Sequence, residues 1–281
     1  MNEDETTPIR AEEIEAWRGH IGRREIRRQR LDIDSLRRFA AAIGADLDVE
    51  RQAPPLAHWA YFLEAVGPEG IGADGHPHRG GLLPAVRLPR RMFAAAVMTF
   101  AAPLSLDVDA ELAMTVVDVR HRSGRAGDLV FVEVDRVLSQ DGAVRLSERQ
   151  TIAYRGQGAA TAVVSASPQP QRPGQVIWSP GPVELFRYSA VTFNAHRIHY
   201  DLPYATLEEG YPGLVVQGPF TAAKLFALAQ AGSTEAIERF EFRATAPLFA
   251  GQPVCLAPGL DGDLMAIRCD GVTAMTARAG G

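Results

Sequence analysis

The sequence lacks the features that mark several classes of protein. Lysine is almost absent, because Lys224 is the only lysine among 29 basic residues, and 34 acidic residues outnumber these. The resulting net charge of −5 offers no broad basic surface, so we expect no nucleic-acid partner. No apolar run reaches the roughly 20 residues that cross a bilayer, and we expect no membrane partner either.

Cysteine is scarce as well. Cys255 and Cys269 are the only two cysteines in 281 residues, and both fall in segments that predict strands. So few cysteines favour a reducing compartment, in which both would be buried thiols. The acidic start of the chain, MNEDETTP, lacks the apolar core of a secretory signal. We therefore expect a cytoplasmic protein.

The hydrophobic periodicity predicts an α+β chain in which helices and antiparallel strands occur in two groups. Helices are expected at residues 11–22, 34–44, 182–192 and 220–231. Strands are expected at residues 98–103, 113–120, 129–138 and 144–154, and again at 238–247, 253–258, 264–269 and 272–278. A basic cluster at residues 23–30 is interpreted as a solvated helix face or a strand edge.

Two short segments recur at nearly the same interval. Residues 36–41, LRRFAA, parallel residues 185–190, LFRYSA, at an offset of 149. Residues 100–104, FAAPL, parallel residues 244–248, ATAPL, at an offset of 144. Each match is weak alone, but the similar offsets favour a duplicated unit built from a helix, a connection and an antiparallel sheet.

A stretch rich in Gly, Ala, Ser, Pro and Gln separates the two copies. This stretch, residues 156–181, has few large apolar side chains and is the predicted linker. The N-terminal unit would then occupy residues 1–155 and the C-terminal unit residues 182–281.

The densest polar cluster follows the helix of the second unit, at residues 188–201, YSAVTFNAHRIHYD. The first unit has Ala-Asp-Leu-Asp at the corresponding place, without a histidine. Residues 211–220, YPGLVVQGPF, then predict a turn, a buried segment and a helix start. We therefore expect one working site in the second unit and a scaffold role for the first.

These two motifs resemble the MaoC-like hydratases and dehydratases of the hotdog fold. The resemblance is greatest to the branch of mesaconyl-C4-CoA (3-methylfumaryl-CoA) hydratase, itaconyl-CoA hydratase and the mitochondrial type 2 hydroxyacyl-thioester dehydratases. Residues 90–154, including the strand GDLVFVE, resemble the first hotdog of that branch. The resemblance covers roughly residue 9 onward and implies a double hotdog whose first unit is degenerate.

One departure from the wider family concerns proton transfer. In the (R)-specific enoyl-CoA hydratases an aspartate ends the helix and a histidine follows five positions later, whereas this chain has Asn194 and His199. An asparagine cannot take a proton, so the resemblance implies that His199 acts as general base and acid. The Asn194 amide would orient the water or the substrate hydroxyl.

The remaining site residues follow from the same resemblance. The N–H of Gly218, at the helix start before Pro219, would stabilise the thioester oxygen. Arg197 would bind a substrate carboxylate or a CoA phosphate, or else form a structural salt bridge. Substrate binding is also expected from the neighbouring residues His196, Val216 and Gln217. Asp201 is interpreted as a helix cap.

The sequence predicts no function for the glycine-rich loop near residue 75. Residues 70–75, GIGADG, match G-x-G-x-x-G by letter, but no helix follows, which excludes a dinucleotide-binding turn. His76 and His78 have no evident carboxylate or thiol cluster around them, so we expect no metal.

The sequence thus predicts a hydro-lyase that hydrates an α,β-unsaturated acyl-CoA, with a short or dicarboxylic acyl group. A dehydratase of 3-hydroxyacyl-ACP or of longer acyl-CoA is the alternative, followed by a thioesterase and by a non-catalytic acyl-thioester binding protein. CoA or ACP would be the substrate carrier, and we expect no cofactor. The expected assembly is a homodimer of double-hotdog chains or a monomer.

Overall fold

The computed structural model describes residues 8–45, 48–49, 53, 56–124, 127–156, 160–167, 170, 172–259 and 263–280. The helices are α1 (Ala11–Arg18), α2 (Ile33–Ile43), α3 (Pro182–Val191) and α4 (Gly218–Ala231). The strands of the first unit are β1 (Arg24–Arg30), β2 (Arg90–Phe100), β3 (Asp109–Gly124), β4 (Gly127–Gln140) and β5 (Ala143–Arg155). Those of the second are β6 (Val176–Trp178), β7 (Arg239–Ala244), β8 (Val254–Pro258), β9 (Asp263–Ile267) and β10 (Thr273–Gly280).

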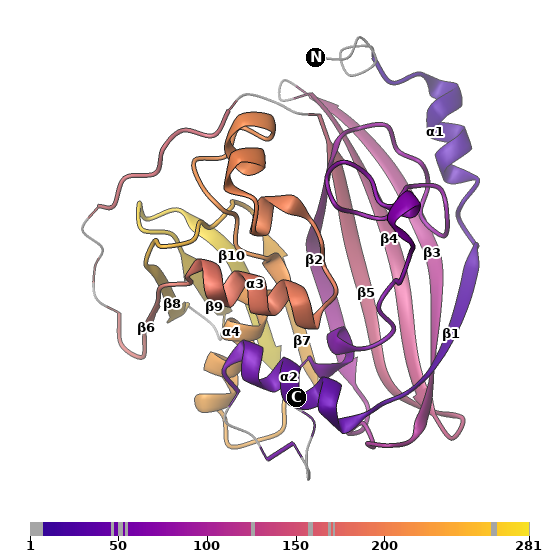
Figure 1. Ribbon diagram of the computed structural model, residues 1–281. Coiled ribbons are helices and arrows are strands. Elements are labelled where there is room, and N and C mark those ends of the chain that lie inside the picture. The colour runs from indigo at the N-terminus through magenta and orange to yellow at the C-terminus, as the bar shows by residue number, and fades with distance from the viewer. Residues whose placement is uncertain are drawn as a thin grey trace.

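The strands form one sheet in which the two units have the same strand order. Along the sheet the order is β1-β3-β4-β5-β2-β7-β10-β9-β8-β6, so each unit places its strands in the same sequence, counted from its outer edge. The two units meet where β2 pairs antiparallel with β7, with Ala96 opposite Phe242 (Figure 1). This order confirms the predicted double hotdog and the duplicated unit behind it.

Several predicted boundaries were wrong. The strand expected at 98–103 is β2, which begins at Arg90, and the first helix ends at Arg18 rather than at residue 22. The basic cluster is the edge strand β1, paired with β3. Strand β6 lies inside the predicted linker and pairs with β8. For the basic cluster the structure thus shows the second of the two alternatives, a strand edge, whereas β6 escaped prediction because it has only three residues.

Helices α2, α3 and α4 pack together in front of the sheet, whereas α1 lies apart from them and contacts β3. Asp32 caps α2 by accepting a hydrogen bond from the Ser35 N–H at 2.7 Å, and Gly44 ends the helix with φ 68°. Helix α2 lies against α3, where the rings of Phe39 and Tyr188 are 6.3 Å apart (Figure 1). Helix α4 is apolar almost all round and is the most buried of the four. No helix within the described ranges is long and apolar enough to cross a membrane.

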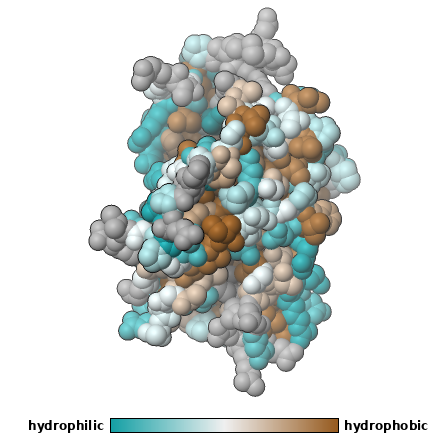
Figure 2. Space-filling model, turned by 90° about the vertical axis from the view of Figure 1, so that its left-hand side faces the viewer, coloured by the Kyte–Doolittle hydropathy of each residue, from teal (hydrophilic) through white to brown (hydrophobic). Residues whose placement is uncertain are grey.

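The first unit has no equivalent of α4 among its described residues. Between α2 and β2 it has only the 3₁₀ turns η2 (Ala57–Ala60) and η3 (Pro68–Gly70) and connecting loops. The inner face of the first sheet is therefore covered by loops instead of a long helix. Figure 2 shows the side of the molecule away from this sheet, where apolar and hydrophilic groups are interspersed. Cys255 and Cys269 are free and buried, as expected.

A fully buried carboxylate ties the loop at η2 to the first sheet. Glu148 on β5 accepts a hydrogen bond from Trp59 Nε1 at 3.0 Å, and its other oxygen lies 3.4 Å from His58 Nε2 and 3.7 Å from Arg136 Nε. Burial alone would raise the pKa of this carboxyl, but the contact with His58 and the charge of Arg136 outweigh it and lower the pKa to about 2. The anion is therefore the form that the fold stabilises.

We expect Glu148→Gln to lower the free energy of unfolding at pH 7 by about 1.5–3 kcal/mol, the usual contribution of a hydrogen bond to a charged group. Because the folded pKa lies below the unfolded value of 4.5, this stabilisation is complete above pH 4.5 and is lost as the pH falls towards 2. Urea unfolding at pH 7 and pH 3 measures both effects. Glu111→Gln, at an exposed ion pair with Arg28, is the control and should cost less than about 1 kcal/mol. Equal losses in the two variants would contradict the prediction.

Candidate active site

The polar segment of the second unit is held against the start of α4. Tyr188 in α3 stacks on Phe220 in α4 with ring centroids 4.8 Å apart. After α3 the chain turns at Asn194 into the 3₁₀ turn η4 (Arg197–His199), and the Val215 N–H donates to the Ile198 carbonyl at 2.9 Å. These contacts bring together the two motifs that the sequence singled out.

His199 is buried and has one defined tautomer. Its Nδ1 lies 2.7 Å from the Val215 carbonyl oxygen. A carbonyl oxygen can only accept, so Nδ1 carries the hydrogen and Nε2 keeps a lone pair in the neutral ring. Burial, followed by the nearby His196, lowers the pKa of His199 to about 3. The resting imidazole is neutral near pH 7 and can accept a proton at Nε2.

Asn194 and the first turn of α4 face a common space. The Asn194 Oδ1 accepts a hydrogen bond from the His196 N–H at 3.1 Å, which leaves the amide NH₂ free to donate elsewhere. Gly218 is the first residue of α4, where the backbone N–H groups have no partner within the helix. A side chain there would begin 3.4 Å from the Phe93 carbonyl oxygen of β2. The start of α4 thus packs closely on the first unit.

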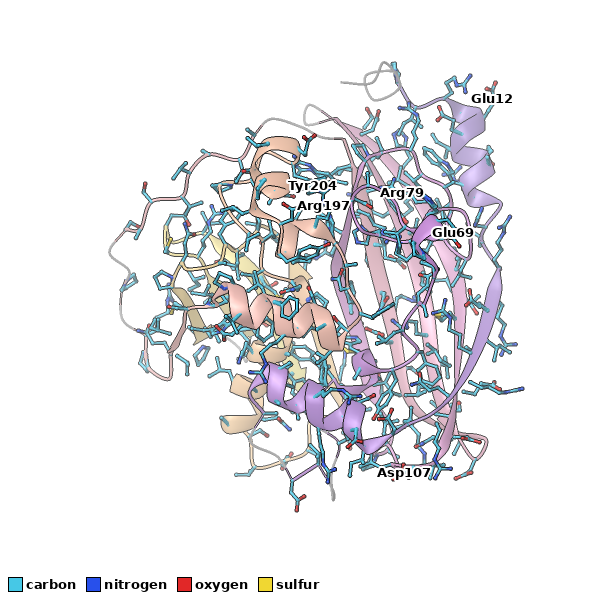
Figure 3. The ribbon with its side chains drawn as sticks, viewed as in Figure 1. Glu12, Glu69, Arg79, Asp107, Arg197 and Tyr204 are labelled. Carbon is cyan, nitrogen blue, oxygen red and sulfur yellow. The ribbon has the colours of Figure 1, made fainter. Side chains whose placement is uncertain are left out.

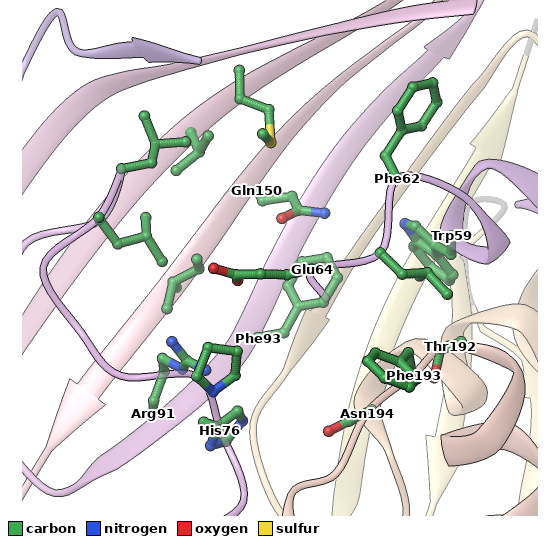
Figure 4. Close-up of a pocket in the computed structure, with 18 of the residues that line it drawn as sticks. Trp59, Phe62, Glu64, His76, Arg91, Phe93, Gln150, Thr192, Phe193 and Asn194 are labelled. Carbon is green, nitrogen blue, oxygen red and sulfur yellow. The ribbon is translucent and has the colours of Figure 1, made fainter. Parts of the chain in front are cut away.

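A cavity of about 520 Å³ connects this point with the first sheet (Figure 4). One end is formed by Asn194 and Pro219, and the inner face of β2 to β5 forms a wall. That wall is partly apolar, with Met114, Val134 and Ile152. Its polar side chains are Arg91, Arg136 and Gln150. The cavity occupies the place where the first unit lacks a long helix.

A loop of the first unit packs against the polar segment of the second, residues 188–201. Gly75 has φ +89°, and a Cβ added there would lie 1.9 Å from the Ala195 carbonyl oxygen. Arg197 donates its backbone N–H to the Asp74 carbonyl at 2.9 Å and its Nη1 to the Ala73 carbonyl at 3.0 Å. Only a glycine allows this approach. The loop, for which the sequence predicts no function, thus contacts the polar segment that contains Asn194 and His199.

The same loop contains Asp74, a carboxylate beside the polar segment that the sequence did not predict there. Both oxygens of Asp74 accept from His76: Oδ1 from its backbone N–H at 2.9 Å and Oδ2 from its Nδ1 at 3.0 Å. The His76 ring lies 4.1 Å from that of His196. Asp74, His76 and His196 each bring a potential ligand atom within 4.8 Å of the others. His76 therefore does have a carboxylate beside it, contrary to the prediction.

Arg197 is engaged within the protein rather than at the cavity. Its Nε and Nη2 donate to Asp201 Oδ2 at 2.9 and 2.8 Å, and the guanidinium lies 4.1 Å from the centre of the Tyr204 ring (Figure 3). Of the two roles left open by the sequence, the structure thus displays the salt bridge. Asp201 Oδ1 accepts from the Tyr204 N–H at 3.1 Å, as expected of a cap.

The three other predicted binding residues lie behind the cavity wall. His196 is buried, with its ring 4.1 Å from that of His76 and 5.4 Å from that of His199, and its Nε2 lies 3.8 Å from Glu209. The Val216 N–H donates to Leu248, and Gln217 Nε2 donates to the Leu185 carbonyl and to Ser189 Oγ, each at 2.9 Å. Gln217 therefore fixes the approach to α4 against α3, and Val216 ties it to the segment after β7.

Comparison with known proteins agrees with this architecture. A model of the hydroxyacyl-thioester dehydratase type 2 family matches residues 56–250. The chain is 39% identical to mesaconyl-C4-CoA hydratase of Chloroflexus aurantiacus over 273 residues, covering 93% of this chain and 96% of that protein. It is 35% identical over 124 residues to the mitochondrial hydroxyacyl-thioester dehydratase type 2 of Schizosaccharomyces pombe, covering 42% of this chain and 41% of that one.

Solved structures share the fold at low identity. HtdX of Mycobacterium tuberculosis matches with a TM-score of 0.64 and 19% identity, covering 92% of this chain and 99% of that one. A second protein of that organism, described as having a double hotdog fold, matches with a TM-score of 0.56 and 13% identity, covering 92% and 95%. On the family match and the near full-length relative, this chain belongs to the hydroxyacyl-thioester dehydratase type 2 family of MaoC-like hotdog proteins.

Proposed function

We propose that this protein is a hydro-lyase that reversibly hydrates an α,β-unsaturated acyl-CoA to a 3-hydroxyacyl-CoA. The observation that carries the proposal is that Asn194 and Pro219, in the first turn of α4, form one end of a cavity, with the buried His199 in the turn that follows Asn194. The near full-length similarity to a mesaconyl-C4-CoA hydratase supports it. A short dicarboxylic acyl group is the proposed substrate.

Each group at this end of the cavity has a part in the reaction. His199 Nε2 takes one proton from a water molecule while the water oxygen bonds to the β-carbon. The Asn194 amide donates a hydrogen bond to that oxygen. The Gly218 N–H, at the positive end of α4, stabilises the negative charge that develops on the thioester oxygen. The proton on His199 then passes to the α-carbon, which completes the addition and restores the neutral imidazole.

A direct test is a spectrophotometric screen of hydration with mesaconyl-C4-CoA, itaconyl-CoA and crotonyl-CoA. Loss of the enoyl-thioester absorbance with formation of the 3-hydroxyacyl-CoA supports the proposal. Absence of hydration with every enoyl-thioester, under conditions where the protein is folded, would sink it. Release of free thiol without hydroxyacyl-CoA would point to a thioesterase instead.

Recognition of the substrate carboxylate is proposed for Arg91. This residue lines the cavity close to His76 and Phe93 (Figure 4). No salt bridge joins Arg91 to a carboxylate of the described residues, whereas Arg197 is held by Asp201. A guanidinium that faces a cavity and has no carboxylate partner in the protein is suited to bind the carboxylate of a ligand.

We expect Arg91→Met to raise KM for mesaconyl-C4-CoA by about 10- to 100-fold, because one charge-assisted hydrogen bond contributes about 1.5–3 kcal/mol. KM for crotonyl-CoA, which has no second carboxylate, should change little. Initial rates with both thioesters measure the difference. Arg278→Met, on the exposed part of β10, is the control. An equal rise for both substrates would show that Arg91 does not recognise the acyl carboxylate.

The apolar part of the cavity wall favours a second candidate, the dehydration of 3-hydroxyacyl-ACP or of a longer acyl-CoA. Met114, Val134 and Ile152 would contact a hydrocarbon chain, and the yeast relative is named as a dehydratase. Increasing turnover with chain length, and no preference for a dicarboxylic thioester, would favour this candidate.

We propose that the protein is cytoplasmic. We also propose that a single chain is sufficient for activity. Asn194 and His199 come from the second unit, Arg91 and the loop at Gly75 from the first, so one chain supplies the whole site. A monomer and a homodimer of double-hotdog chains are both compatible with this. Specific activity that stays constant on dilution through the dimer dissociation range would support the proposal.

A further inference from the structure

The Asp74–His76 pair is a group of titratable side chains at the cavity that the proposed mechanism does not use. It belongs to the first unit but lies on the catalytic segment of the second, through the contact of Gly75 with Ala195 and two hydrogen bonds from Arg197. These contacts fix the backbone on both sides of the pair. The position of His76 relative to the active site is therefore as well determined as that of His199.

The carboxylate determines the tautomer of His76. Asp74 stays ionised, because its bonds to His76 outweigh burial and keep the pKa of the carboxyl well below its usual range. A carboxylate only accepts, so His76 Nδ1 carries the hydrogen and Nε2 has the lone pair. Burial lowers the pKa of His76 to about 4 in spite of Asp74, so the ring is neutral near pH 7.

His76 also faces the substrate space. It lines the cavity together with Asn194 and Pro219, and its neighbours there are Arg91 and, on the opposite side, the buried His196. Both imidazoles thus have an unprotonated Nε2: His76 lines the cavity together with Asn194, and His199 lies in the turn that follows Asn194. The asparagine is a donor that cannot take a proton, and each histidine is an acceptor.

We infer that His76 is a second catalytic histidine, contributed by the first unit, whose Nε2 accepts one O–H of the attacking water. The other O–H of that water donates to His199, and the Asn194 amide donates to its oxygen. One lone pair then remains for the β-carbon. This inference rests on the proposed hydratase function.

This arrangement accounts for both hydrogens of the attacking water. The proton on the His199 side moves to His199 and then to the α-carbon. The hydrogen on the His76 side stays on the oxygen and becomes the hydroxyl hydrogen of the product. Asp74 is a positioning residue, since it keeps the lone pair of His76 at Nε2 and does not touch the water.

Two variants test the inference with mesaconyl-C4-CoA as substrate. We expect His76→Ala to lower kcat by about 10²-fold or more with little change in KM, because it removes an interaction with the reacting water and not with the CoA. Added imidazole should restore part of the rate. Asp74→Asn should also lower kcat selectively, since its amide NH₂ would turn Nδ1 into the acceptor and Nε2 into a donor.

A matched control is available at a histidine–aspartate pair that does not line the cavity. His121 contacts Asp128 at 2.8 Å in a similar pair outside the cavity, and His121→Ala should leave kcat unchanged. Wild-type kcat in His76→Ala and Asp74→Asn would overturn the inference, as would loss of wild-type activity on treatment with EDTA and its return with Zn²⁺. A wild-type protein that hydrates no enoyl-CoA would instead refute the proposed function itself.

Discussion

Replacement of His199 by alanine should lower kcat for the hydration of mesaconyl-C4-CoA by about 10³-fold, within the range that general acid–base catalysis supplies. The reason is the lone pair at Nε2, which the hydrogen bond from Nδ1 to the Val215 carbonyl fixes in place. Without it, the variant lacks the group that takes the proton from water and returns it to the α-carbon. Stopped-flow or steady-state loss of the enoyl-thioester absorbance measures the change.

A second substitution separates catalysis from folding. His199→Asn retains an amide that can donate to the Val215 carbonyl, so the fold should persist, but it offers no base. We therefore expect a similar fall in kcat with a melting temperature close to that of the wild type. Turnover at the wild-type rate in either variant would remove His199 from the mechanism.

Replacement of Gly75 by alanine should have the largest effect on structure. The residue has φ +89°, which costs a non-glycine residue roughly 1–3 kcal/mol. The added Cβ would also lie 1.9 Å from the Ala195 carbonyl oxygen, which is backbone and cannot rotate away. With the cost of overpacking included, we expect a loss of about 2–5 kcal/mol in the free energy of unfolding.

Activity should fall in the same variant, because Ala195 lies between Asn194 and His196. A displacement of about 1 Å at reacting groups can reduce the rate by about 10²-fold. Gly81→Ala is the control, since a Cβ there meets nothing within 4 Å and the residue has no positive φ. Urea unfolding and hydration rates of the two variants are the measurements. If Gly75→Ala matched Gly81→Ala in both, the loop would not support the site.

The features that the sequence predicts well are local ones. The hairpin of β4 and β5, the capped helix α2 and the approach to α4 all rest on contacts between residues close in the chain. The duplication was also visible, because it copies local patterns at a constant offset. The segment at residues 188–201 met the start of α4 as expected, since only a short connection separates them.

The contribution of the first unit to the site could not be predicted from local sequence patterns. Gly75 and Ala195 are far apart in the chain, and no periodicity relates them. His76 looked like an ordinary loop residue, because hydrogen bonding by Asp74 two positions earlier depends on the turn between them. Arg197 illustrates the reverse problem: its position in the motif suggested a ligand contact, whereas Asp201 one helical turn later binds its guanidinium.

The pairing of β2 with β7 affects how the chain folds during its synthesis on the ribosome. Apart from the pairing of β2 with β7, strands β1 to β5 pair with one another, so the first sheet can form as soon as Arg155 has left the ribosome. The outer edge of β2 then keeps unpaired backbone groups until β7 is synthesised, on the order of 10 seconds later at about 5–20 residues per second. An open edge of that kind invites pairing with other chains. The nascent first unit is thus the stage at which this protein most needs protection from aggregation.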